Sequence, residues 1–148
     1  MNELLTIAAI TAAVIGHPRP TIPYTCAPSP IVLNHLEYDG MTYLTENNVP
    51  LRVVISPYPC GGAKLAVYAM KHVDVGLTEP QREQVQIGVE TVVHETLHVA
   101  GGQTEAATAR WTAKVAPIVL GQMLSAPRNN AAGRPALRHW LTTRAARR

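Results

Sequence analysis

Three residues near the middle of the chain, His94, Glu95 and His98, form the pattern His-Glu-x-x-His. Residues four positions apart lie on one face of a helix, so His94 and His98 can direct two imidazole nitrogens at a single point, as tetrahedral zinc requires. Glu95 would flank that point without binding the metal itself. The pattern therefore predicts two zinc ligands and a base, the combination that activates a water molecule at a metal ion.

The residues after His98 predict a sharp turn and a third ligand. Gly101 and Gly102 favour the end of the helix, because the residue that follows a helix often takes the left-handed conformation that Gly adopts without strain. The turn would return Glu105 toward the metal and keep a fourth position for water. If Glu105 does not bind, the candidates for the third ligand are Cys60, His72, Asp74 and His139. The competing interpretation is an exposed helix with two solvated histidines.

The motif lies within a predicted helix from Thr78 to Ala100. Thr78 and Gln81 form a capping box, and Pro80 suits the first turn. Apolar residues cover more than one narrow stripe of this helix, which predicts that it is buried. A second helix is expected from Thr104 to Ser125, with Glu105 in its first turn.

The chain before these helices is expected to supply a small sheet. Five prolines between His17 and Pro30 predict an extended connector. Residues 31–33 begin a short strand or helix, Asp39-Gly40 predicts a hairpin turn, and residues 41–44 and 51–56 predict strands. For residues 64–75 we favour a strand over a helix at residues 63–71. The expected fold is α+β: a small, mostly antiparallel sheet followed by the motif helix and a second packed helix.

The two ends of the chain differ from its centre. Residues 1–16 are mostly apolar, which fits either a signal-like segment or a core helix capped near Asn2. Residues 128–148 contain six Arg and no acid, whereas residues 1–127 carry seven basic and ten acidic side chains. The expected organisation is an apolar segment at 1–16, a catalytic domain at 17–127 and a basic tail or short helix at 128–148. The tail could contact nucleic acid or an anionic surface, although a solvated end is the more common use of such a segment.

The two cysteines, Cys26 and Cys60, form either a disulfide or a pair of buried free thiols. A disulfide would favour a secreted or cell-envelope protein, and free thiols a cytoplasmic one.

The segment from His94 to Glu105 resembles the zincin metallopeptidases. It is most similar to compact gluzincin-type proteins, in which a Glu from the next helix is the third zinc ligand, although in most of them that Glu lies further along the chain than here. The metzincin pattern, His-Glu-x-x-His-x-x-Gly-x-x-His/Asp, is matched only through Gly101, because Thr104 stands where the ligand is expected.

The resemblance implies a zinc peptidase that acts on peptide or protein substrates. Glu95 would take the proton of a zinc-activated water as it attacks a peptide carbonyl, and would then pass the proton to the leaving amine. Tyr68 and His72 are candidates for stabilising the oxyanion. Thr91 and Glu90 are candidates for orienting the ring of His94.

Two alternatives stay open at this point. Peptide deformylases also carry His-Glu-x-x-His, with an upstream Cys as third ligand, and Cys60 would take that place here. A non-catalytic binding protein, stabilised by zinc and contacting its partner through the basic tail, is the other alternative.

Overall fold

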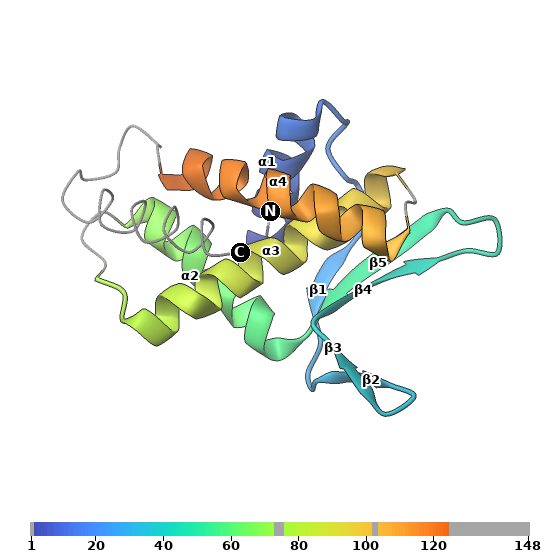
Figure 1. The fold of residues 1–148 in the computed structure, drawn as a ribbon, viewed down its shortest axis with the longest axis horizontal. Coiled ribbons are helices and arrows are strands. Elements are labelled where there is room, and N and C mark those ends of the chain that lie inside the picture. Colours follow the sequence, from blue (N-terminus) through green and yellow to red (C-terminus); the bar gives the residue numbers. More distant parts are fainter. Residues whose placement is uncertain (1, 73–75, 102–103, 125–148) are drawn as a thin grey trace.

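The computed structural model describes residues 2–72, 76–101 and 104–124. In this part of the chain, helices form most of the molecule and a small sheet lies at one end (Figure 1), so the predicted α+β fold is confirmed. The elements in chain order are α1 (Glu3–Ile15), β1 (Tyr24–Cys26), β2 (Ile31–Leu33), β3 (Leu36–Tyr38), β4 (Gly40–Leu44), β5 (Pro50–Ile55), α2 (Pro57–Lys71), α3 (Glu79–Gly101) and α4 (Glu105–Leu124).

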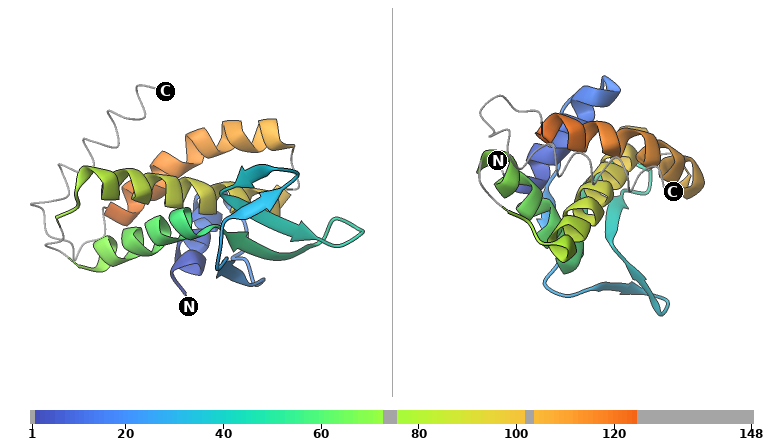
Figure 2. Two further views of the ribbon diagram at one scale, coloured as in Figure 1. Left: turned by 90° about the horizontal axis from the view of Figure 1, so that it is seen from below. Right: turned by 60° about the vertical axis from the view of Figure 1, so that its left-hand side comes forward.

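Helix α3 is the centre of the fold. It contacts the three other helices and strands β4 and β5, and the views in Figures 1 and 2 show it running between α2 and α4. Val85, Val89, Val92 and Val93 are buried along its length. The burial predicted from the spread of apolar residues around this helix is confirmed.

The main sheet has the strand order β1-β5-β4. Strand β1 is parallel to β5, with Tyr24 opposite Val53, and β4 is antiparallel to β5, with Thr42 opposite Val53. Gly40 allows β4 to approach α3, because a Cβ atom at this position would lie 2.9 Å from Thr91 Cγ2 and 3.0 Å from Glu95 Cγ. The edge strand β4 is thereby held directly beside the helix that carries the motif.

The hairpin expected at Asp39-Gly40 lies elsewhere. Strands β2 and β3 pair antiparallel around Asn34 and His35, whose φ angles of 51° and 67° are both left-handed. Two consecutive left-handed residues are the signature of a tight two-residue hairpin turn. Asp39 instead connects β3 to β4, which belong to different sheets, so the predicted position of the turn was wrong.

The strand favoured at residues 64–75 is also wrong, because residues 57–71 form helix α2. Pro57 begins the helix, where a missing N–H costs nothing. Gly62 and Gly88 let the backbones of α2 and α3 touch: a Cβ on Gly62 would overlap the carbonyl oxygen of Gln84, and one on Gly88 would overlap backbone atoms of α2. Gly62 and Gly88 thus form the contact surface between the two helices. Residues 73–75 lie outside the described part of the chain.

Residues 3–15 form a helix that packs on the core, which is one of the two interpretations of the N-terminal segment. The Asn2 side chain accepts a hydrogen bond from the Leu5 N–H at 2.8 Å, and Ile7 and Ala8 are fully buried. No helix in the described part of the chain is both long and apolar enough to cross a membrane. The basic segment at 128–148, with its predicted short helix, lies outside the described residues.

A disulfide joins Cys26, at the end of β1, to Cys60, in the first turn of α2. It ties the sheet to the helices across a sequence separation of 34 residues. Closing a loop of that length in the unfolded chain stabilises the fold by about 4 kcal/mol in the chain-entropy account. The sulfur of Cys60 is consequently not offered to a metal as a thiolate.

Tyr24 gives the fold a specific dependence on alkaline pH. Its side chain is 1% exposed, and its hydroxyl lies 2.8 Å from Thr96 Oγ1. Burial raises the pKa of the phenol from 10.0 to about 12; the Thr96 hydrogen bond opposes this shift and the Glu95 charge adds to it. The folded state therefore holds the phenol proton more tightly than the unfolded state does.

We expect this to appear as a loss of stability at high pH that Tyr24→Phe removes. The contribution is fully present below pH 10, where tyrosine is neutral in both states, and is lost as the pH rises toward 12, at a cost of about 3 kcal/mol. Urea unfolding of the wild type and of Tyr24→Phe across this range measures the difference, with the exposed Tyr58→Phe as control. Parallel declines in wild type and Tyr24→Phe would show that Tyr24 is not responsible.

Candidate metal centre

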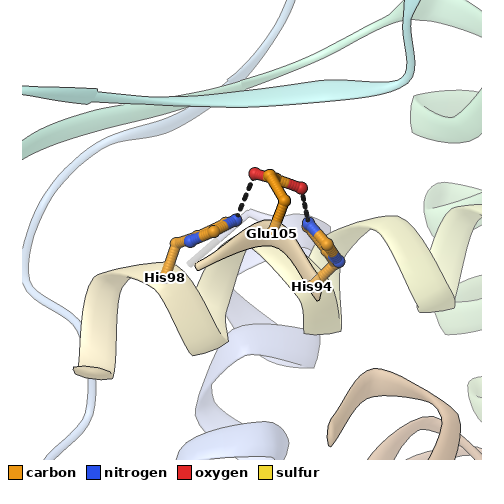
Figure 3. A group of neighbouring side chains, drawn as sticks. All are labelled: His94, His98 and Glu105. Atoms are coloured by element: carbon orange, nitrogen blue, oxygen red, sulfur yellow. Dashed lines mark hydrogen bonds and ion pairs between the residues drawn. The ribbon is translucent and has the colours of Figure 1, made fainter. Parts of the chain in front are cut away.

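The structure brings together His94, His98 and Glu105 from two helices (Figure 3). His94 and His98 project from one face of α3, and Glu105 reaches them from the first turn of α4. The Nε2 atom of His94 lies 3.1 Å from Glu105 Oε2, and that of His98 lies 2.7 Å from Glu105 Oε1. The three candidate ligand groups converge on one point.

The spacing of these atoms suits a single zinc ion. Their ligand atoms all lie within 4.8 Å of one another. Bonds of about 2.0–2.1 Å in a tetrahedral site place neighbouring ligand atoms about 3.3 Å apart. The 3.1 Å separation of His94 Nε2 from Glu105 Oε2 is close to this value, and the 2.7 Å separation of His98 Nε2 from Glu105 Oε1 is shorter. Two imidazoles and one carboxylate are also one of the donor sets that catalytic zinc sites use.

His98 provides a further test of the fit. Its Nε2 atom is buried and makes no hydrogen bond, although Glu105 Oε1 is within 2.7 Å. A buried nitrogen without a hydrogen bond is costly unless another partner satisfies it. A zinc ion between the imidazole and the carboxylate would be such a partner, so the residues present fit the metal.

Thr112 on α4 fixes the orientation of His94. Its hydroxyl lies 2.7 Å from the Thr108 carbonyl oxygen, to which it donates, and 3.3 Å from His94 Nδ1. With its proton directed to Thr108, the hydroxyl accepts a hydrogen bond from the Nδ1–H of His94. This tautomer leaves the Nε2 lone pair directed toward the shared point, the usual arrangement behind a metal-binding histidine.

Thr112 takes the orienting role that the sequence suggested for Thr91 or Glu90. The Thr91 hydroxyl donates to the Ile87 carbonyl at 2.7 Å, and Glu90 accepts a hydrogen bond from Gln86 at 2.8 Å. The one available sequence signal for Thr112 was its place seven residues after Glu105, two turns along the same face of a helix.

Glu95 is buried beside the candidate metal ligands. Only 5% of the residue is exposed, and Thr42 on β4 donates a hydrogen bond to its Oε1 at 2.8 Å. Burial raises the pKa of this carboxyl, and the Thr42 hydrogen bond and the nearby histidines oppose the rise. A carboxylate whose pKa is raised is a better proton acceptor, which is the property a general base needs. Thr42 was missed because it lies 53 residues from Glu95 in sequence.

The centre opens into a cavity of about 950 Å³ between β4, α3 and α4. Thr42, His94, Glu95, His98, Glu105 and Thr112 all line it. A cavity of this size accommodates a segment of a peptide or a small molecule. The candidate metal ligands and Glu95 therefore face the same accessible space.

Tyr68 and His72, predicted as oxyanion donors, are not brought to this cavity. They lie on α2, where their rings stack at 3.9 Å and His72 Nδ1 contacts the Tyr68 carbonyl oxygen at 2.9 Å. Both are exposed. The expectation rested on a strand at this position, and the helix directs the two side chains elsewhere. Among the residues described, Tyr38 is the tyrosine that lines the cavity.

Of the other candidates for a third ligand, the two that lie within the described residues, Cys60 and His72, do not line the cavity. Cys60 is held in the disulfide, His72 follows the last residue of α2, and Asp74 and His139 are outside the described residues.

Comparison of the chain with protein-family models, with curated protein sequences and with solved structures finds no match.

Proposed function

We propose that the chain is a zinc-dependent metallopeptidase that hydrolyses peptide bonds at the His94–His98–Glu105 centre, with Glu95 as general base. The observation that carries the proposal is the convergence of three ligand groups beside a buried carboxylate on one cavity wall. A structural zinc site usually has four protein ligands and is closed, whereas this group has three ligands among the described residues and faces a cavity. That difference favours a catalytic zinc over a purely structural one.

Each residue of the site has a separate role in the proposed reaction. Bound zinc would polarise the scissile carbonyl and make water more acidic. The Thr42 hydroxyl holds Glu95 Oε1, which leaves Oε2 to accept the proton of the attacking water. Because burial raises the pKa of this carboxyl, Glu95 retains the proton long enough to deliver it to the leaving amine. Thr112 keeps the His94 ring in the required tautomer.

The disulfide also bears on where the protein acts. Disulfides persist mainly in oxidising compartments, so the bond between Cys26 and Cys60 favours a role outside the cell or in the cell envelope. Peptides and exposed protein segments are the corresponding substrates.

The direct test combines metal analysis with a search for cleavage products. We expect the purified chain to carry one zinc ion and to cleave internal bonds in a mixture of unstructured peptides, as read by mass spectrometry. Dialysis against a chelator should stop cleavage, and adding zinc should restore it. A chain that carries one zinc ion and cleaves none of a broad peptide mixture would contradict the proposal.

A further inference from the structure

We propose that the end of the cavity beside Asp39, Gln86 and Glu90 is a subsite for a positively charged side chain, Lys or Arg, of the peptide substrate. This inference rests on the proposed peptidase function and adds the substrate class. It is argued from the position of these residues, their hydrogen-bonding groups and the charge of the cavity wall.

All three residues line the cavity, and Gln86 and Glu90 lie on the N-terminal side of His94 along α3. Gln86, Glu90 and His94 recur every four residues on α3, and all line the cavity. A rise of 1.5 Å per residue places Glu90 about 6 Å from His94 along the helix axis. The four-carbon stem of a lysine held at the scissile bond can cover about that distance.

Strand β4 brings Asp39 toward the same end. Thr42 bonds Glu95, whereas Gly40 approaches both Glu95 and Thr91. The N-terminal end of β4 therefore lies nearer to the N-terminal half of α3 than Thr42 does. Asp39 directly precedes Gly40 and also lines the cavity, so it continues this direction toward Glu90.

Gln86 provides evidence for a ligand that is independent of the two acidic residues. The residue is 4% exposed, and its side-chain nitrogen donates to Glu90 Oε1 at 2.8 Å. That bond fixes the orientation of the Gln86 amide. The Oε1 atom of Gln86 is buried without a hydrogen-bond partner. A buried acceptor on a cavity wall, left without a donor, marks a place where a ligand donor would be stabilised.

Helix α4 carries a second acceptor without its usual helical donor, on a residue that lines this cavity. Pro117 lies inside the helix and has no N–H, so the carbonyl of Ala113 lacks its normal helical donor. Both residues line the cavity. An ammonium or guanidinium group, with several N–H donors and no acceptor, complements a wall of this kind.

The charges of the residues that line the cavity also favour a positively charged ligand. Four carboxylates line the cavity, those of Asp39, Glu90, Glu95 and Glu105, and no Lys or Arg is found among the described residues that line it. Glu95 and Glu105 belong to the metal centre. The remaining two acids favour a cationic substrate group over a neutral or anionic one.

The test compares matched peptides on the full-length, zinc-loaded chain. A neutral eight-residue scaffold of Ser, Gly and Ala carries one Lys at each position in turn, and norleucine replaces the Lys in the partner peptide. At the best position we expect kcat/KM for the Lys peptide to exceed that for norleucine by at least about tenfold. Asp39→Asn with Glu90→Gln should reduce this ratio to about twofold or less, whereas the matched exposed variant Glu37→Gln should leave it unchanged.

Binding separates this inference from the proposed function. The same peptides are titrated against the Glu95→Gln chain, which retains the subsite. Equal binding and equal cleavage of Lys and norleucine peptides at every position would overturn the subsite and leave the peptidase standing. A Lys preference in binding that disappears in the double variant supports the subsite even if no peptide is cleaved, and in that case the proposed activity alone fails.

Discussion

Replacing Glu95 with Gln is expected to lower kcat for peptide hydrolysis by about a thousandfold while leaving zinc bound. The amide cannot accept the proton of the attacking water, and loss of a general base typically costs 10²–10⁴-fold. The amide oxygen can still accept the Thr42 hydrogen bond now made to Glu95 Oε1 at 2.8 Å, so the local structure should persist. Single-turnover hydrolysis of a cleaved peptide, together with zinc content and the thermal unfolding midpoint, measures the effect.

The matched control for this variant is Glu46→Gln, which makes the same chemical change at an exposed position in the β4–β5 loop. It should hydrolyse peptides at the wild-type rate. If the Glu95→Gln chain holds zinc, unfolds at the wild-type temperature and still cleaves at the wild-type rate, Glu95 is not the base and the catalytic interpretation is wrong.

Replacing Glu105 with Gln should weaken zinc binding by about 100-fold or more. Loss of the residues that merely orient ligands already costs 10–100-fold, and here an anionic ligand itself is lost. The side chain is 80% exposed, so the substitution removes little packing and the fold should be retained. Competition with a chromophoric chelator measures the affinity, and Glu46→Gln again serves as control.

Unchanged zinc affinity and stoichiometry in the Glu105 variant would place the third ligand elsewhere. Asp74 and His139 would then be examined first, because Cys60 is held in the disulfide and His72 stacks on Tyr68. A loss of affinity with a fold otherwise unchanged would support the ligand set proposed here.

The parts of the fold predicted well are those determined by neighbouring residues. The capping box at Thr78, the glycines after His98 and the apolar spacing located α3 and α4 closely. The three candidate ligands are separated by no more than eleven residues, so local helix geometry was enough to bring them together. Their role in binding metal stays a prediction.

The parts that were missed depend on contacts between distant segments. Helix α2 was taken for a strand at residues 64–75, and the role of its glycine contact is visible only when α3 packs against it. Thr42 reaches Glu95 through the pairing of β4 with β5 and the close approach at Gly40. The β2–β3 turn uses Asn34 and His35 in left-handed conformations. Neither position is a Gly, so the usual sequence signal for such a turn is missing.

The site residues come from two parts of the fold: the candidate metal ligands from two successive helices, and the hydrogen-bond partner of Glu95 from the sheet. The three candidate ligands belong to a single helix–turn–helix unit, whose short loop costs little entropy to close. The partner of the base, Thr42, comes instead from a strand that must first be assembled into the sheet. A chain that has formed only α3 and α4 would already contain the three candidate ligands, whereas the environment of Glu95 is complete only when the sheet has docked, so the proposed peptidase activity would require the fully folded state.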